Sequence, residues 1–353
     1  MKMKFHGAAV TVSLILALTL ALSGCGQGAA APESAPAAES SKTEESASQQ
    51  ESVSSEESVP ESESESAAEE SEPAIVITDM LGREVVLDEP AERVVALTAA
   101  DCEMLYAIGA GDLLVGRGEW CDYPPEVFEI PAVQSGSETD IEQIIALDPQ
   151  VLLMASMGQT EEQVNALEEA GIRVVVSDAQ DIAGTYQALR MLGALTGHEK
   201  EAEDVISGMQ ETFDTISANR IPDGGSIYFE VSPLEYGLWA AGPGSFMNEV
   251  AEMMGLTNIF ADAPSSWAEV SPEEVIARNP DYIVTITMYY GEGPTPEEEI
   301  CSREGWDVIT AVRENRILNL PNNELSRPGP RLADGARMLY DFVTGEGSVQ
   351  NAA

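Results

Sequence analysis

The sequence predicts an α/β protein of two lobes, each with a mainly parallel central sheet flanked by helices, joined by a single long α-helix. Short apolar strands alternate with helices over residues 74–180 and again over residues 221–345, a pattern typical of parallel sheets covered on both faces. Residues 181–220, between the two halves, have no strand pattern. Glu142–Pro149 is echoed by Glu273–Pro280, so a short helix that ends before a proline and leads into a buried strand occurs once in each half.

The amino-terminal half opens with two β-branched runs around Gly82, which predict a hairpin over Ile75–Leu87. The elements expected after it are a strand at Arg93–Leu97, a helix at Thr98–Ala107, a strand at Leu113–Val115, a helix at Asp140–Ala146, a strand at Val151–Met154, a helix at Glu161–Ala170 and a strand at Ile172–Val176. These strands are short and apolar, as expected for strands buried on both faces. We therefore assign residues 74–180 to an amino-terminal lobe.

Residues 181–220 are expected to be helical and to connect the lobes. A helix-breaking Thr196-Gly197 divides them. Beyond that break, apolar side chains recur at helical spacing, at Val205, Met209, Phe213 and Ile216. The spacing predicts a helix over Glu199–Asn219 of about 21 residues, roughly 30 Å long.

The strand–helix alternation then resumes in a carboxyl-terminal lobe, residues 221–345. Besides the short helix of the echo, its expected elements are strands at Ile227–Val231 and Tyr236–Ala240, a helix at Ser245–Met254, strands at Asp281–Thr287 and Arg316–Leu320, and a closing helix at Arg331–Val343. Residues 346–353 are a short tail.

The first 73 residues have a different composition. Residues 1–24 have the features of a secretory signal peptide, because Lys2 and Lys4 precede an apolar run and small residues precede Cys25. The linker that follows, to residue 73, contains 13 Glu, 13 Ser and one Lys after Cys25, and no aromatic residue. Such a stretch cannot bury enough apolar surface to offset its chain entropy. We expect residues 25–73 to be a disordered acidic tether.

The distribution of charge excludes several classes of function. The chain has a net charge of −45. Residues 1–25 carry +2, the linker carries −12 and residues 74–353 carry −35, from 14 basic and 49 acidic side chains. A nucleic-acid partner is not expected, because phosphate contacts need a basic face. Two histidines in the whole chain argue against a histidine-rich metal site, and we expect no metal site.

An enzyme is not expected either. The chain has no Gly-x-Ser-x-Gly motif and no His-x-x-x-His pair, and residues 74–353 contain one histidine. A hydrolase needs a nucleophile with a base, or a metal site. Paired carboxylates could serve a glycosidase, but many acidic residues make such pairs common by chance. An extracellular hydrolase remains a remote alternative, and a surface adhesin would not need two echoed lobes.

Several motifs together resemble those of one protein family. They are Leu-Ser-Gly-Cys ending at Cys25, Thr78-Asp79-x-x-Gly82-Arg83, Asp122-Tyr123-Pro124-Pro125, Gly242-x-Gly244-Ser245-Phe246 and Arg327-Pro-Gly-Pro-Arg331. In their order and spacing they resemble the helical-backbone (class III) substrate-binding lipoproteins of bacterial ABC importers, which bind cobalamin, iron siderophores or haem. The resemblance implies a monomer that is lipid-anchored through Cys25 on the extracytoplasmic face of the cell membrane. It also implies an ABC permease dimer with its ATPase subunits as partner, and no cofactor besides the ligand.

The resemblance gives the echoed glutamates a role. In this family a glutamate on the top of each lobe docks on arginines of the permease, and the matching positions here are Glu142 and Glu273. A two-fold permease dimer could bind both alike. The simpler interpretation is that each is a first-turn acid favoured by the helix dipole, which does not explain their equivalent placement.

The ligand is expected between the lobes, at loops that follow strand ends, where open α/β sheets bind ligands. The candidate ligand-binding residues are Trp120, Trp267, Tyr289, Tyr290 and Arg327. Aromatic rings suit a large flat or macrocyclic ligand, since they offer contact area at low entropic cost. A single loop tryptophan could equally cap its own lobe.

Within the family the resemblance is closest to the cobalamin-binding members, through Trp120-Cys-Asp-Tyr-Pro-Pro, Trp267-x-x-Val-Ser-x-Glu273 and Arg327. Gly136 and Ala155 stand where those members have tryptophans, and Asn323 where they have an aspartate. Haem and ferric siderophores therefore stay open as ligands. Axial ligands for haem would come from Tyr289, Tyr290, Met154 or Met157. The positions of Cys102, Cys121 and Cys301 allow a Cys102–Cys121 disulfide.

Overall fold

A computed structural model describes residues 74–345 except 137, 157–158, 290 and 321–322. The expected signal peptide, the acidic linker, the carboxyl-terminal tail, Cys25, Met157 and Tyr290 lie outside the described residues. All described residues belong to one compact unit. Within these ranges, no helix has the length and apolar character needed to cross a membrane.

The amino-terminal lobe is built around a five-stranded parallel sheet. Its strands are β3 (Val94–Ala96), β4 (Leu114–Gly118), β5 (Ala132–Val133), β6 (Val151–Met154) and β7 (Arg173–Val176), in the order β5-β4-β3-β6-β7. The helices of this lobe are α1 (Ala99–Ala107), α2 (Ile141–Ala146) and α3 (Glu161–Glu169), and the antiparallel hairpin is β1 (Ile75–Thr78) with β2 (Glu84–Leu87). Val95 lies beside Leu152 in β6 and Gly116 in β4, and all three strand pairs around β3 and β6 are parallel. The predicted parallel sheet is confirmed.

One glycine allows β3 and β4 to end close together. A Cβ atom on Gly118 would lie 2.2 Å from the carbonyl oxygen of Leu97, a distance that no side chain tolerates. Glycine is therefore required here for close backbone approach. This contact places the turn after β4, which contains Trp120, beside the start of α1.

The carboxyl-terminal lobe has a mixed sheet. Its strands are β8 (Ser226–Ser232), β9 (Trp239–Ala241), β10 (Thr257–Asn258), β11 (Trp267–Glu269), β12 (Tyr282–Thr285) and β13 (Ile317–Asn319), in the order β11-β9-β8-β12-β13, with β10 also paired to β8. Its helices are α6 (Phe246–Met254), α7 (Pro272–Arg278), α8 (Pro296–Ser302), α9 (Thr310–Arg313) and α10 (Leu332–Thr344). Strands β8, β10, β12 and β13 are parallel, whereas β9 pairs antiparallel with β8 and β11.

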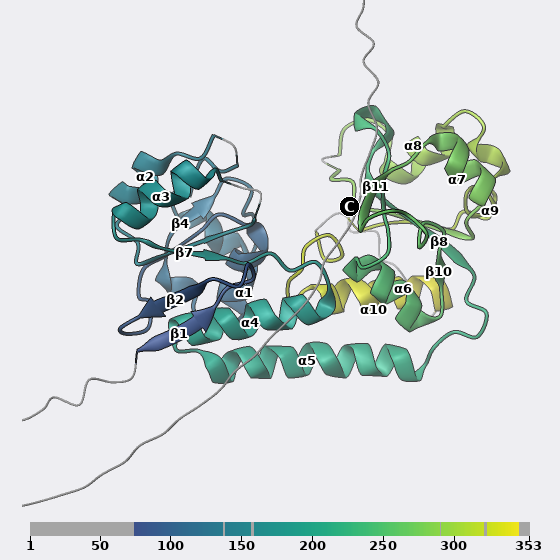
Figure 1. Ribbon diagram of the computed structural model, residues 1–353. Helices are drawn as coiled ribbons and strands as arrows, with labels where there is room; N and C mark the ends of the chain where they lie inside the picture. Colours follow the sequence, from purple (N-terminus) through teal and green to yellow (C-terminus); the bar gives the residue numbers. More distant parts are fainter. Residues whose placement is uncertain (1–73, 137, 157–158, 290, 321–322, 346–353) are drawn as a thin grey trace, which may run out of the picture. The chain divides into compact units, whose positions relative to one another are not determined.

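Two helices connect the lobes. Helix α4 (Ile182–Thr196) ends at Gly197, which adopts a left-handed conformation with φ of 70°, as is usual for a glycine after a helix. Helix α5 (Glu199–Ala218) follows and is the long helix that the periodicity predicts. It packs against α4, α6 and α10, and Figure 1 shows α4 and α5 side by side. Apolar side chains on its inner face are buried, among them Met209, Phe213 and Ile216.

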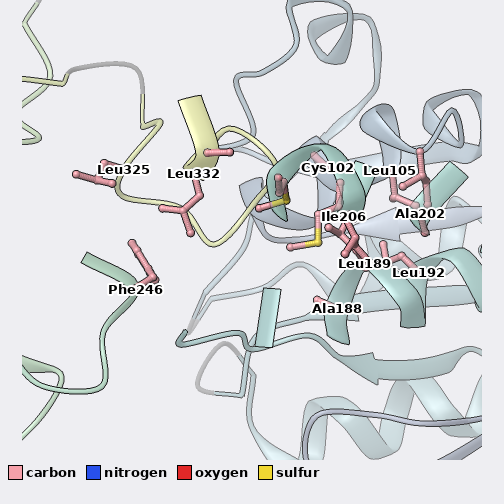
Figure 2. Packing of buried hydrophobic residues seen from close by; sticks show 14 of the residues in the cluster. Cys102, Leu105, Ala188, Leu189, Leu192, Ala202, Ile206, Phe246, Leu325 and Leu332 are labelled. Carbon is pink, nitrogen blue, oxygen red and sulfur yellow. The ribbon is translucent and has the colours of Figure 1, made fainter. Parts of the chain in front are cut away.

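A single hydrophobic cluster runs through the connecting helices. It includes residues of α1, α4 and α5 together with Phe246, Leu325 and Leu332 from the carboxyl-terminal half. Figure 2 shows Leu189 and Leu192 of α4 grouped with residues of α1 and α5. Because protein cores are close-packed and deform little, this shared core favours small adjustments between the lobes over a wide hinge motion.

The segment between β7 and α4 contacts the carboxyl-terminal lobe. The carbonyl of Gln180 accepts a hydrogen bond from the backbone N–H of Phe246 at 3.2 Å. The N–H of Ile182 donates to Glu249 Oε2 at 2.8 Å. The segment after β7 thus contacts α6, and α4 and α5 follow as an antiparallel pair (Figure 1).

Candidate functional site

The turn after β4 presents an exposed tryptophan at the carboxyl end of the amino-terminal sheet. Trp120 comes two residues after the end of β4, and 73% of its surface is exposed. Its neighbour Cys121 is fully buried and donates its backbone N–H to the carbonyl of Gly118 at 3.1 Å. The turn is therefore anchored on one side of Trp120 while the indole ring remains free to contact a ligand.

Exposed apolar side chains also gather at strand ends in the carboxyl-terminal lobe. Strands β8 and β12 are parallel neighbours, with Thr285 beside Glu230, so their carboxyl ends share one edge of the sheet. The residues that follow these ends and are exposed, here called the apolar edge, are Leu234, Tyr236, Trp239, Met288 and Tyr289. Exposed large apolar groups that gather at one place commonly mark binding surfaces.

Among the residues of this apolar edge, the sequence analysis predicted only Tyr289 to bind the ligand. Tyr236 was expected in a strand, but it lies in a 3₁₀ turn at Leu234–Tyr236, and β9 begins only at Trp239. Tyr236 is 76% exposed. The signal that could have identified Tyr236 and Trp239 is the one used for Tyr289, namely an aromatic residue shortly after a parallel strand.

Trp267 is held more firmly than the other candidate aromatics. It begins β11 and lies opposite Ala241 of β9. Its indole N–H donates to Gln180 Oε1 at 3.4 Å, and its ring packs edge-to-face on Phe246 at 5.6 Å. Trp267 is half-buried. Through its contacts with Gln180 and Phe246 it secures the segment after β7 against the carboxyl-terminal lobe, in addition to any contact it makes with a ligand.

Arg327 is held by two carboxylates of the amino-terminal lobe. Its guanidinium donates to Glu103 Oε1 at 2.9 Å and to Asp122 Oδ1 at 2.5 Å. Only 16% of the Arg327 side chain is exposed. The structure thus gives Arg327 a role that the sequence did not predict, which is to bridge α1 and the turn after β4. Its contact with a ligand stays a prediction.

Arg331 completes this interaction. Its Nε and Nη2 atoms donate to the two oxygens of Glu103 at 2.9 and 2.7 Å, the bidentate geometry in which arginine binds carboxylates most strongly. The guanidinium also lies 3.9 Å from the centre of the Tyr123 ring, a cation–π contact. We call Glu103, Arg327 and Arg331 the Glu103 clamp.

A pocket of about 460 Å³ lies beside the clamp. Its lining consists of Glu103, Tyr106, Ala107, Tyr123, Pro124, Glu126, Pro330, Arg331 and Asp334. Trp120, Trp267, Tyr289 and Arg327 are not among these residues. The pocket thus lies beside the clamp, and its lining includes Tyr123 and Pro124 of the segment after β4.

Glu142 and Glu273 occupy equivalent positions in the two lobes. Each is the second residue of its helix, after the N-caps Asp140 in α2 and Ser271 in α7. Both are exposed, and within the part of the chain that the structure describes neither pairs with an arginine or lysine. They are available to bind arginines of another protein.

The three departures from the cobalamin-binding pattern have local consequences. Gly136 has a φ of 91°, a conformation that tryptophan rarely adopts. Ala155 directly follows β6 and offers no ring. Asn323 also has a positive φ, of 64°, and its Oδ1 accepts a hydrogen bond from Ser326 at 3.0 Å. Met154 is 3% exposed and belongs to the core, so it cannot reach a haem iron.

Comparison with known proteins decides the family. Residues 94–324 match the sequence pattern of the periplasmic binding proteins, which is more than half of the chain. The chain belongs to the periplasmic binding protein family. The prediction that the chain is a substrate-binding protein of the ABC importer class is confirmed, and so is the predicted two-lobed α/β fold.

Three relatives illustrate the relationship. The ABC transporter substrate-binding lipoprotein YvrC of Bacillus subtilis is 29% identical over 279 residues, which is 76% of this chain and 85% of YvrC. The vitamin B12-binding protein of Salmonella paratyphi A is 34% identical over 257 residues, 72% of this chain and 91% of that protein. The crystal structure of a possible iron-binding, periplasmic solute-binding protein from Staphylococcus epidermidis superposes with a TM-score of 0.60 at 30% identity, and covers 72% of this chain and 99% of that one.

These relatives define the role of this periplasmic binding protein in outline. Proteins of the family bind small solutes outside the cytoplasm and work with the permease and ATPase components of ABC transporters. The relatives are solute-binding transport proteins, and none of the three is described as an enzyme.

Proposed function

We propose that this periplasmic binding protein captures a corrinoid of the cobalamin type and delivers it to an ABC permease, from a lipid anchor at Cys25. The observation that carries the proposal is that exposed aromatic rings follow parallel strand ends in both lobes, with Trp120 in one and the apolar edge in the other. The 34% identity to a vitamin B12-binding protein supports the choice of ligand.

The chemistry of the two surfaces suits a large planar ligand. A corrin ring presents two wide apolar faces and a polar rim. Aromatic side chains bury such faces at low entropic cost, because few torsions must be fixed. Trp120, Tyr236 and Trp239 are all more than a third exposed, so each has surface that binding can remove from water.

The proposed ligand site uses a set of rings different from that of the cobalamin-binding members. Gly136 and Ala155 contribute no ring, and Tyr236 and Trp239 supply aromatic surface in the other lobe. Asn323, which replaces an aspartate, lies near Met288 of the apolar edge, with Nδ2 4.0 Å from Sδ. A neutral amide there suits a ligand with amide groups on its rim.

A ferric siderophore or haem is the alternative ligand. The 30% identity to a possible iron-binding protein favours an iron chelate. For haem, Tyr289 is the candidate axial ligand among the residues that the structure describes. It is 39% exposed, and its hydroxyl donates to the carbonyl of Gly293 at 3.2 Å. A phenolate would have to leave that carbonyl to coordinate iron.

Delivery is proposed to use Glu142 and Glu273. Both carboxylates lie in the first turn of a helix, at equivalent positions of the two lobes, and both are exposed. A two-fold permease could therefore contact the lobes through similar arginines. Charge pairs of this kind mainly steer association and fix its orientation.

A ligand panel tests the proposed cargo. The full chain is incubated separately with cyanocobalamin, hemin and a ferric hydroxamate, passed through a desalting column, and its visible spectrum is recorded. The proposal predicts that the cobalamin bands elute with the protein at a ratio close to one. Retention of hemin or of the ferric chelate, with loss of cobalamin, would replace the corrinoid with that ligand.

A further inference from the structure

Two buried cysteines of the amino-terminal lobe converge on the same backbone atom. Cys102 lies near the start of α1, and its Sγ is 3.7 Å from the carbonyl oxygen of Ala96. Cys121 lies in the turn after β4, and its Sγ is 3.9 Å from the same oxygen. Both side chains are 0% exposed. The two thiols are thus directed at one point beyond the end of β3.

The surrounding structure holds both cysteines in place. Strands β3 and β4 are paired, with Ala96 beside Arg117. The guanidinium of Arg117 donates to the carbonyl of Cys121 at 3.1 Å, and the Cys121 N–H donates to Gly118. On the other side, Thr98 caps α1, with the N–H of Asp101 donating to its hydroxyl at 3.1 Å. Both backbones that a cross-link would join are therefore already ordered.

The thiols also interact with each other. The pKa of the Cys102 thiol lies well above its usual range, first because of a hydrogen bond with the Cys121 thiol and then because of burial. A thiol whose pKa is raised and whose surface is buried reacts slowly. Oxidation therefore has to take place before the turn closes over α1, while the chain folds, or during local opening.

We propose that Cys102 and Cys121 form a structural disulfide in the mature protein. Outside the cytoplasm such bonds form and persist. In the balanced exchange, the two thiols react with one small-molecule or oxidoreductase disulfide. One S–S bond forms between Cys102 and Cys121, the donor disulfide is reduced, and its two sulfurs leave as thiols with the two protons. Cys301 lies exposed on α8 and takes no part.

The disulfide would strengthen the part of the lobe that presents Trp120. Cys121 lies between Trp120 and Asp122, and Cys102 directly precedes Glu103. The bond would fasten the turn after β4 to α1, and so join covalently the two segments that Arg327 bridges through Asp122 and Glu103. This inference goes beyond the proposed function and requires no particular ligand.

Peptide mapping tests the bond directly. The full chain is folded with oxidised glutathione, alkylated under denaturing conditions and digested with trypsin. Cleavage after Arg93, Arg117 and Arg173 separates peptides 94–117 and 118–173, each with one of the two cysteines. The proposal predicts that these peptides are joined and that peptide 279–303, with Cys301, is alkylated. Alkylation of both Cys102 and Cys121, or a bond from either to Cys301, would overturn it.

Thermal unfolding gives a second, independent readout. A disulfide that closes the loop from Cys102 to Cys121 should raise the Tm, so we predict a fall of about 5 °C or more when the oxidised chain is reduced. Cys102→Ala, Cys121→Ala and the double variant should each lose the response to reductant, whereas Cys301→Ala should keep it. An unchanged response in either single variant would contradict the disulfide, whatever ligand the protein binds.

Discussion

Glu103 in α1 accepts two hydrogen bonds from the guanidinium of Arg331, although the two residues are 228 positions apart. The Glu103 side chain is only 2% exposed, so its charge depends on arginine for compensation. Because Arg327 binds the same carboxylate, one buried glutamate of the amino-terminal lobe holds the segment that leads into α10. The lobes are thus joined by an ionic contact as well as by α4 and α5.

Glu103→Gln should destabilise the protein by about 3 kcal/mol, since removal of one partner of a buried ion pair leaves the other charge uncompensated. Asp122 and Glu324 still contact the arginines, which limits the loss. Urea unfolding measures the change. Glu126→Gln is the matched control, because Glu126 lines the same pocket but is exposed. Equal stability of the two variants would show that the Glu103 clamp does not stabilise the protein.

Asp101 makes stability depend on pH. Burial raises the pKa of Asp101 from its ordinary 3.8 to about 6, against the opposing effect of the Ser177 and Thr98 hydroxyl groups, and the nearby Asp178 adds to the rise. Between these values the folded state binds more protons than the unfolded state. The stability that the protonated carboxyl contributes is therefore complete below about pH 4 and is lost as pH rises through about 6.

Asp101→Asn should remove this dependence. Between pH 4 and pH 7 the wild type should lose about 3 kcal/mol more than the variant, from the size of the shift. Urea unfolding at several pH values checks this, with Asp112→Asn, an exposed aspartate after α1, as control. Parallel curves for wild type and Asp101→Asn would show that the carboxyl is not perturbed.

Phe213→Ala in α5 should cost about 3–5 kcal/mol, because a buried aromatic side chain is lost and a cavity remains. Phe213 is 4% exposed and belongs to the cluster that runs through both connecting helices. Denaturant unfolding compares it with Glu211→Ala, an exposed position of the same helix. A loss below 1 kcal/mol would mean that α5 contributes little to the shared core.

Glu142→Arg combined with Glu273→Arg should abolish transport in cells that express the matching permease, while ligand affinity stays within twofold of wild type. Charge reversal replaces attraction to the permease by repulsion. Radiolabelled ligand uptake and equilibrium binding are measured side by side. The control is Glu161→Arg with Glu304→Arg, two exposed acids elsewhere on the lobes. Unchanged uptake by the Glu142/Glu273 variant would rule out docking through these residues.

Most regular elements could be predicted because they leave a local pattern, although helices α8 and α9 were missed. The strand predicted at Val151–Met154 has the same bounds as β6, and the predicted long helix differs from α5 by one residue at its end. Strands β5, β10 and β11 were missed, since two or three residues are too few to show an alternation of apolar and polar side chains.

The site was predicted less completely than the fold. Aromatics after strands could be identified from order along the chain alone, as for Trp120 and Tyr289. The partners of Arg327 could not, because Glu103 is 224 residues away and nothing local indicates which loops the fold brings together. Tyr236 was predicted to begin a strand, but Gly237 turns the chain before β9 with a φ of 87°.

The most direct test of the central claim is calorimetric titration of cyanocobalamin into the wild type, Trp120→Ala, Tyr289→Ala and Leu81→Ala. Leu81 is 57% exposed in the turn of the β1–β2 hairpin and serves as control. The account predicts one site, with affinity reduced at least tenfold by loss of either ring and unchanged in Leu81→Ala. Tight binding that is equal in all four proteins would show that the ligand does not lie at these strand ends.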